Sequence, residues 1–147
     1  MENLDLPFVT IRLKKICSKS VVRLTATLSN KSITAEDTRI LETWLDKFYR
    51  HVDETNTRFC VIYVFDTTID DAETIQRLCA LVGSERKITK RLSVTTCVVA
   101  PSFLSLVAQM AMHVYSVEGM VHFPATLEEA KNTCLNEANS SIVPKRE

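Results

Sequence analysis

Glycine is scarce in this sequence, with 2 glycines among 147 residues. Enzymes that bind nucleotides commonly use glycine-rich loops, because a backbone without side chains can approach phosphate groups closely. The sequence contains neither such a loop nor a G-x-S-x-G nucleophile motif. We therefore predict a protein that is not an enzyme and that uses no cofactor.

Net charge is also absent, because 18 Lys and Arg residues balance 18 Asp and Glu residues. A balanced chain has no overall field that attracts phosphate groups, so we expect no binding to nucleic acid. The longest apolar stretch lies around Leu104 to Val117 and is interrupted by polar residues at positions 105, 109 and 113. A membrane span needs about 18 or more consecutive apolar residues, so we expect none.

Paired cysteine motifs are missing as well. The five cysteines are odd in number and contain no C-x-x-C pair, which argues against a disulfide framework or a zinc knuckle: Cys17, Cys60, Cys79, Cys97 and Cys134. They are expected to be buried thiols in a reducing compartment. The first five residues include Glu2 and Asp5 and no basic residue, whereas a signal peptide would begin with basic residues. These features predict a cytoplasmic protein, or a virion location if the chain is a viral structural subunit.

Hydrophobic periodicity predicts a single α/β domain over residues 1–138, followed by a flexible tail over residues 139–147. Strands are expected over residues 8–13, 21–28, 59–65, 94–99 and 120–123. Helices are expected over residues 35–53 and from positions 71, 103 and 127 onward. The order β-β-α-β-α-β-α-β-α predicts a mixed, mostly parallel sheet with an antiparallel hairpin at the N-terminus.

Several local patterns refine this prediction. The apolar run from Phe59 to Phe65 is typical of a strand that is covered on both faces. Thr34 and Thr126 are each followed three residues later by an acidic residue, as in a helix capping box. An apolar stripe along the third helix is expected to face the core: Phe103, Leu106, Val107, Met110 and Val114.

The end of the expected domain carries the most specific motif. Residues Phe123–Ala130 read FPATLEEA, and the central strand ends in Asp66 before an acidic helix start. In these features and in its element order, the chain resembles the STAS or SpoIIAA-like domain, and more distantly the core of the Sec14 or CRAL-TRIO domain. The stretch is similar to that family's closing F-x-T-L-E-E-A element.

The resemblance implies a binding role for the loop after the central strand. In STAS domains this loop carries a D-S-S-G-like motif, whose serine is phosphorylated by a partner kinase to switch binding off. If Asp70 matches the motif's aspartate, Asp71 replaces the serine, which implies a site without the switch. The expected partner-binding residues are Asp66, Thr67, Thr68, Ile69, Asp70, Asp71 and Glu73. Ile69 is expected either to anchor the partner or to pack under the second helix.

The leading hypothesis is therefore a non-catalytic protein–protein interaction module with a protein partner. One alternative is a structural subunit of a large assembly, such as a virus particle. Another is a miniature Sec14-like lipid or small-ligand binder whose third helix acts as a lid. A catalytic alternative would place magnesium on Asp66, Asp70 and Asp71. A metal site between Cys60, Cys97 and His122 is a further alternative.

Overall fold

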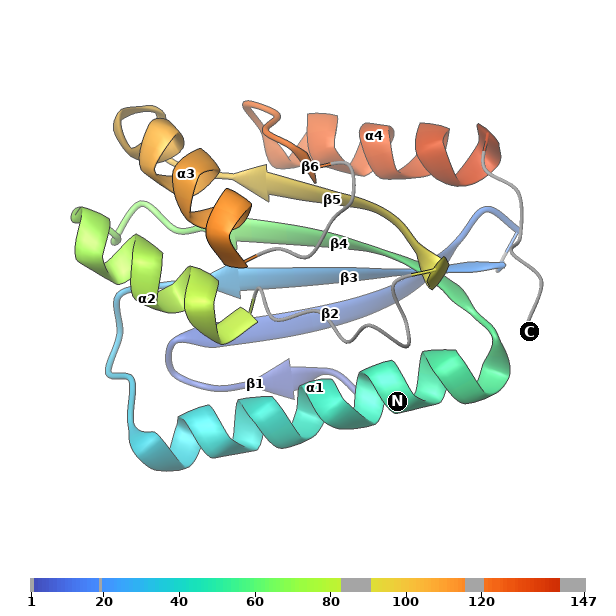
Figure 1. Cartoon of the computed structure of the whole chain (residues 1–147), viewed down its shortest axis with the longest axis horizontal. Coiled ribbons are helices and arrows are strands. Elements are labelled where there is room, and N and C mark those ends of the chain that lie inside the picture. The colour runs from blue at the N-terminus through green and yellow to red at the C-terminus, as the bar shows by residue number, and fades with distance from the viewer. Residues whose placement is uncertain (1, 19, 83–90, 116–120, 141–147) are drawn as a thin grey trace.

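The protein consists of one mixed β-sheet with helices on both of its faces (Figure 1). The computed structural model describes residues 2–18, 20–82, 91–115 and 121–140. Within these residues the sheet has six strands in the order β1-β2-β3-β4-β5-β6. The first three strands pair in antiparallel fashion, and β3 to β6 pair in parallel. This arrangement confirms the predicted fold class.

Among the elements that can be given bounds from the described residues, the order is the predicted one with two additions. Their bounds are β1 (Leu4–Asp5), β2 (Val9–Ile16), β3 (Val21–Leu28), α1 (Ala35–Thr55), β4 (Arg58–Phe65), α2 (Ala72–Val82), β5 (Ser93–Val99), the 3-10 helix η2 (Ser102–Leu104), α3 (Ser105–Tyr115), β6 (Val121–His122) and α4 (Leu127–Ser140). The additions are β1 and η2. Helix α4 extends two residues into the predicted tail, and residues 141–147 lie outside the described residues.

The capping residues expected from the sequence begin the helices. The Thr34 side chain accepts a hydrogen bond from the Asp37 backbone N–H at 3.1 Å, which starts α1. At α4, the Thr126 hydroxyl accepts from the Glu129 N–H at 3.2 Å, and a Glu129 carboxylate oxygen accepts from the Ala125 N–H at 3.1 Å. These bonds satisfy backbone donors that have no partner inside the helix.

Helices α1, α2 and α3 cover one face of the sheet, and α4 covers part of the other (Figure 1). Strands β3 to β6 follow each other in order, so crossovers of the same hand place their helices on the same side. The larger core lies under α1 to α3. The smaller core lies under α4 and includes Cys60, Ile62, Cys97, Ala130 and Cys134.

Strand β4 is buried on both faces, as its continuous apolar run predicts. Alternate residues such as Val61 and Tyr63 belong to the larger core, and Cys60 and Ile62 belong to the smaller one. Ile62 and Val64 pair in parallel with Cys97 and Val99 of β5. The central strand therefore joins the two layers of helices.

Four of the five cysteines are buried thiols, as expected, and Cys17 is a correction. Cys17 is half-buried in the β2–β3 turn, where φ is positive at Cys17 and Ser18. Its Sγ donates a hydrogen bond to Asn139 Oδ1 at 2.8 Å, which links the turn to the end of α4. A tight turn at the sheet end leaves no room to bury this side chain fully.

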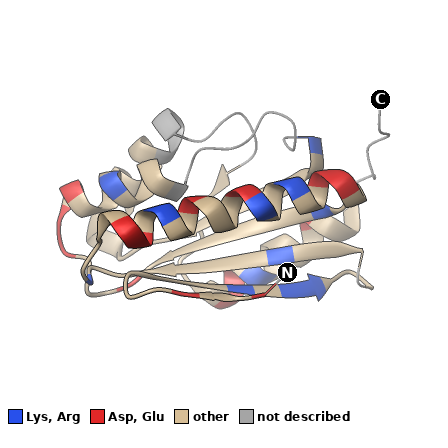
Figure 2. Cartoon of the chain, turned by 90° about the horizontal axis from the view of Figure 1, so that it is seen from below, with Lys and Arg blue, Asp and Glu red and all other residues tan. Residues whose placement is uncertain are grey.

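The outer surfaces are mixed in charge. Figure 2 shows Lys and Arg alternating with Asp and Glu along the exposed side of α1. Among the described helices, none combines the length and the apolar character needed to cross a membrane.

Candidate functional site

One edge of the sheet brings together the loops that follow β4 and β5. The two strands are parallel, so their carboxyl ends meet at this edge. Helices α2 and α3 start there and run back side by side in contact with each other (Figure 1). We call this region the strand-end surface and define it as residues 66–73 together with Phe103, Leu106 and Met110. All seven partner-binding residues predicted from the sequence lie in its first segment.

Asp66 closes the turn after β4. Its backbone N–H donates to the Leu28 carbonyl at 2.7 Å, and its carbonyl accepts from the Ile69 N–H at 3.1 Å. Asp66 Oδ1 accepts a hydrogen bond from the Thr68 N–H at 2.7 Å. The half-buried carboxylate of Asp66 therefore shapes the loop.

The two threonines of the loop are exposed. Thr68 Oγ1 accepts a hydrogen bond from the Asn30 backbone N–H at 3.1 Å, which joins the loop to the segment after β3. The hydroxyl of Thr68 thus stabilises the loop.

Ile69 is fully buried, with 0% of its surface exposed, and it packs in the larger core with Ile75 and Leu78 of α2. The sequence left two roles open for Ile69, an exposed anchor or a residue packed under α2. Its burial supports the second role, so Ile69 is not an anchor on the strand-end surface.

Asp71 is the cap of α2. Its Oδ1 accepts a hydrogen bond from the Thr74 backbone N–H at 2.6 Å. This bond, together with one from the Thr74 side chain, lowers the pKa of Asp71. The exposed Arg77 of α2 lies close enough to Asp71 to lower its pKa further, and the exposed carboxylates of the loop and first turn of α2 are Asp70, Asp71 and Glu73. These residues give the strand-end surface its negative charge.

Asp71→Ala is expected to lower the melting temperature of the protein by a few degrees at pH 7, because the first turn of α2 loses its cap. Asp71→Asn keeps a capping oxygen and is the matched control. The pKa of Asp71 is lower in the folded state than its ordinary value of 3.8. The carboxylate's extra stabilisation is thus present above about pH 4 and is lost as pH falls through the folded pKa. Thermal melts between pH 2 and pH 7 measure this effect, and equal melting temperatures for Asp71→Ala and wild type at pH 7 would contradict it.

The apolar side chains of α3 face the solvent, which corrects the sequence prediction. Phe103 and Leu106 are each 68% exposed, and Met110 is 63% exposed. Their spacing of three and four residues places them on one side of η2 and α3. Val107 is half-buried, and the side chain of Val114 lies outside the described residues. The predicted core stripe is therefore largely an exposed apolar stripe.

A different set of residues faces the core from this helix. Leu104, Ala108 and Ala111 are buried and belong to the larger core. Their spacing of four and three residues also forms one helical face. Two alanines on that face allow the helix backbone to approach its neighbours closely. The larger side chains on the opposite side then remain outside the core.

Leu104→Ala and Leu106→Ala form a matched pair for testing which face is buried. Leu104 is 5% exposed, so its truncation should lower the free energy of unfolding by about 2–4 kcal/mol. Leu106 is 68% exposed, so its truncation should change that free energy by less than about 0.5 kcal/mol. Urea denaturation of both variants measures the difference, and a larger loss for Leu106→Ala would reverse the assignment of faces.

The thiols considered as metal ligands lie together under α4. Cys134 receives hydrogen bonds from Cys60 and Cys97, which lower the pKa of Cys134 and, together with burial, raise the pKa of the other two. His122 Nε2 lies 3.6 Å from a Glu137 carboxylate oxygen. Across the described residues, no three His, Cys, Asp or Glu side chains are arranged to hold a metal ion.

The lid expected of a Sec14-like binder does not match the orientation of α3. A lid would turn its large apolar side chains inward over a cavity, whereas Phe103, Leu106 and Met110 point outward. Two pockets lined by described residues along α1 have volumes of about 190 Å³ and 280 Å³. Both are smaller than the roughly 300–1,000 Å³ of typical pockets for drug-sized ligands.

Comparison of the chain with protein-family models, with curated proteins and with solved structures finds no match.

Proposed function

We propose that this protein is a non-catalytic protein-interaction module that binds a protein partner at the strand-end surface. The observation that carries the proposal is the exposure of Phe103, Leu106 and Met110 on one side of η2 and α3. A single exposed apolar residue is common on protein surfaces, but three large ones on one helical face are typical of an interface. Phenylalanine and methionine are also enriched at interfaces.

The charges at the start of α2, the helix that contacts α3, define the chemistry of the partner. Asp70, Asp71 and Glu73 are exposed in the loop and first turn that precede the helix neighbouring α3. An apolar centre with an acidic rim favours a partner whose apolar contact is bordered by Lys or Arg. Two copies of this chain joined through the same surface would bring their acidic rims together. The charges therefore favour a basic partner over a second copy.

The resemblance of the sequence to STAS domains supports the same location, because that family binds partners through the loop after its central strand. If Asp70 matches that family's aspartate, Asp71 takes the place of the phosphorylated serine, and Asp71 caps α2. A carboxylate there cannot be phosphorylated by a serine kinase. The proposed module therefore binds without a phosphorylation switch at this position.

The proposal predicts which exposed apolar residues matter for binding. The full chain is used as bait, and retained proteins are identified by mass spectrometry. Phe103→Ala/Leu106→Ala should retain the partner at least tenfold more weakly than wild type while keeping the wild-type melting temperature. Leu135→Ala is the matched control, because Leu135 is 41% exposed on α4, across the sheet. It should retain the partner as wild type does.

The retained partner should carry a basic contact surface, and its binding should depend on salt concentration. Asp70→Asn/Glu73→Gln should weaken binding at low salt and reduce the dependence of binding on salt concentration. A partner held equally by wild type and by Phe103→Ala/Leu106→Ala would contradict the proposed surface. Retention of this chain itself through the same residues would instead favour a structural subunit of an assembly.

A further inference from the structure

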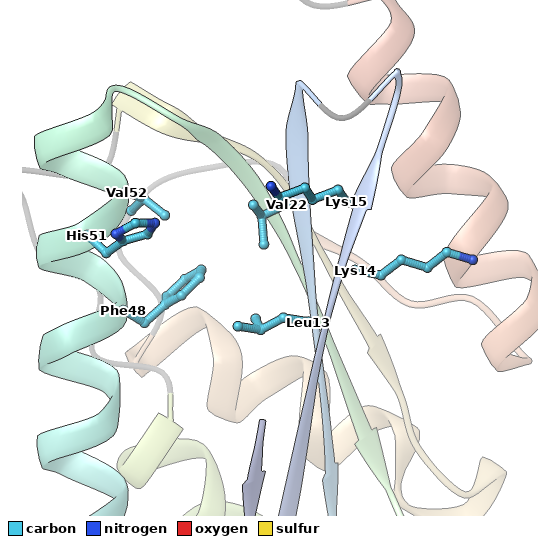
Figure 3. Close-up of a pocket in the computed structure, with 7 residues that line it drawn as sticks. All are labelled: Leu13, Lys14, Lys15, Val22, Phe48, His51 and Val52. Carbon is cyan, nitrogen blue, oxygen red and sulfur yellow. The ribbon is translucent and has the colours of Figure 1, made fainter. Parts of the chain in front are cut away.

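A hollow lies at the opposite end of the sheet from the strand-end surface. It is a cavity of about 190 Å³ between the C-terminal half of α1 and strands β2 and β3 (Figure 3). Val22, near the start of β3, lines this cavity, whereas the strand-end surface lies beyond the other end of the parallel strands. The cavity is thus a separate feature from the proposed partner-binding surface.

The base of the cavity is apolar. Phe48 and Val52 of α1 are buried and line it from one side, and the half-buried Leu13 and Val22 line it from the sheet. Half-buried apolar side chains in a concave site retain contact with water, so burying them under a ligand is favourable. The base therefore suits an apolar group of limited size.

The mouth of the cavity carries groups that can bind an anion. Lys15 and His51 are exposed, and Figure 3 shows their side chains on the cavity side of β2 and α1, respectively. Lys14 also borders the cavity, but its side chain extends to the opposite face of the sheet, because side chains alternate along a strand. None of the described residues that line the cavity is acidic. The positive charge of Lys15 at the mouth, with the N–H groups of His51, thus complements a carboxylate.

From this arrangement we infer a binding site for a small carboxylate with a short apolar tail. The carboxylate accepts hydrogen bonds from Lys15 Nζ and the His51 ring at the mouth, and the tail packs against Phe48 and its apolar neighbours. A water molecule takes about 30 Å³ in the liquid, and a methylene group is of similar size, so the cavity accommodates about six such groups. Hexanoate is therefore the appropriate probe.

Three probes of equal tail length separate the contributions of charge and tail. Isothermal titration of the full chain should give saturable binding of hexanoate, binding of 1-hexanol that is at least threefold weaker, and no binding of hexylamine. In the series from propanoate to hexanoate, affinity should rise about fourfold for each added methylene. Equal affinities for hexanoate and 1-hexanol, or the absence of saturable hexanoate binding, would overturn the inference.

Two neighbouring lysines provide a matched pair of variants. Lys15→Gln should weaken hexanoate binding at least threefold, whereas Lys14→Gln should leave it unchanged, because Lys14 extends away from the cavity. Lys15→Glu should lose hexanoate and gain binding of hexylamine. Equal effects of Lys14→Gln and Lys15→Gln would show a general charge effect and overturn the site. Phe103→Ala/Leu106→Ala should bind hexanoate normally, so this test is independent of the proposed partner.

Discussion

The burial of β4 on both faces is the constraint on which the arrangement of the protein depends. Residues of this strand alternate between the larger core under α1 to α3 and the smaller core under α4. A strand that is apolar on both faces needs cover on both sides, and such strands are typical of parallel sheets. Because β4 and β5 are parallel, their carboxyl ends lie at the same edge of the sheet. The strand-end surface exists because β4 is central and parallel to β5.

Much of the fold could be predicted from the sequence, because the strongest patterns report on burial. The apolar run of β4 and the capping signals at Thr34 and Thr126 all correspond to elements of the structure. Strand β1 was not predicted, because Leu4–Asp5 is too short to show alternation and is defined by its pairing with β2. Such an element depends on tertiary contacts that a local pattern does not contain.

Helix α3 shows why the candidate site was harder to predict than the fold. Its sequence contains two sets of residues with helical spacing, one with Phe103 and Leu106 and one with Leu104 and Ala108. Hydrophobicity favours the larger side chains as the buried set, but close packing against the sheet and α2 selects the face with the alanines. The sequence does contain one indication of this exposed stripe, because the helix has more large apolar residues than a single buried face needs. The acidic loop lies between β4 and α2, as its sequence predicts, and its role in binding stays a prediction. The role of Ile69 depends on its burial, which the local sequence does not determine.

The strand-end surface and the cavity beside α1 lie at opposite ends of the sheet and differ in charge. Exposed carboxylates lie in the loop and first turn of α2, the helix that contacts α3, whereas Lys15 and His51 border the cavity beside α1. A chain without net charge can therefore carry two regions of opposite local charge. Local charge and exposed apolar area, rather than overall composition, distinguish the ligands that each region can bind.

Hydroxyl-radical footprinting of the full chain tests the orientation of α3 most directly, because it reports on each side chain separately. The account predicts fast oxidation of Phe103, Leu106 and Met110 in the free protein and slow oxidation of the buried Leu104 and Phe48. Addition of the partner should protect the first three side chains. Slow oxidation of Phe103, Leu106 and Met110 in the free, monomeric protein would contradict the central claim that this stripe is exposed and available for binding.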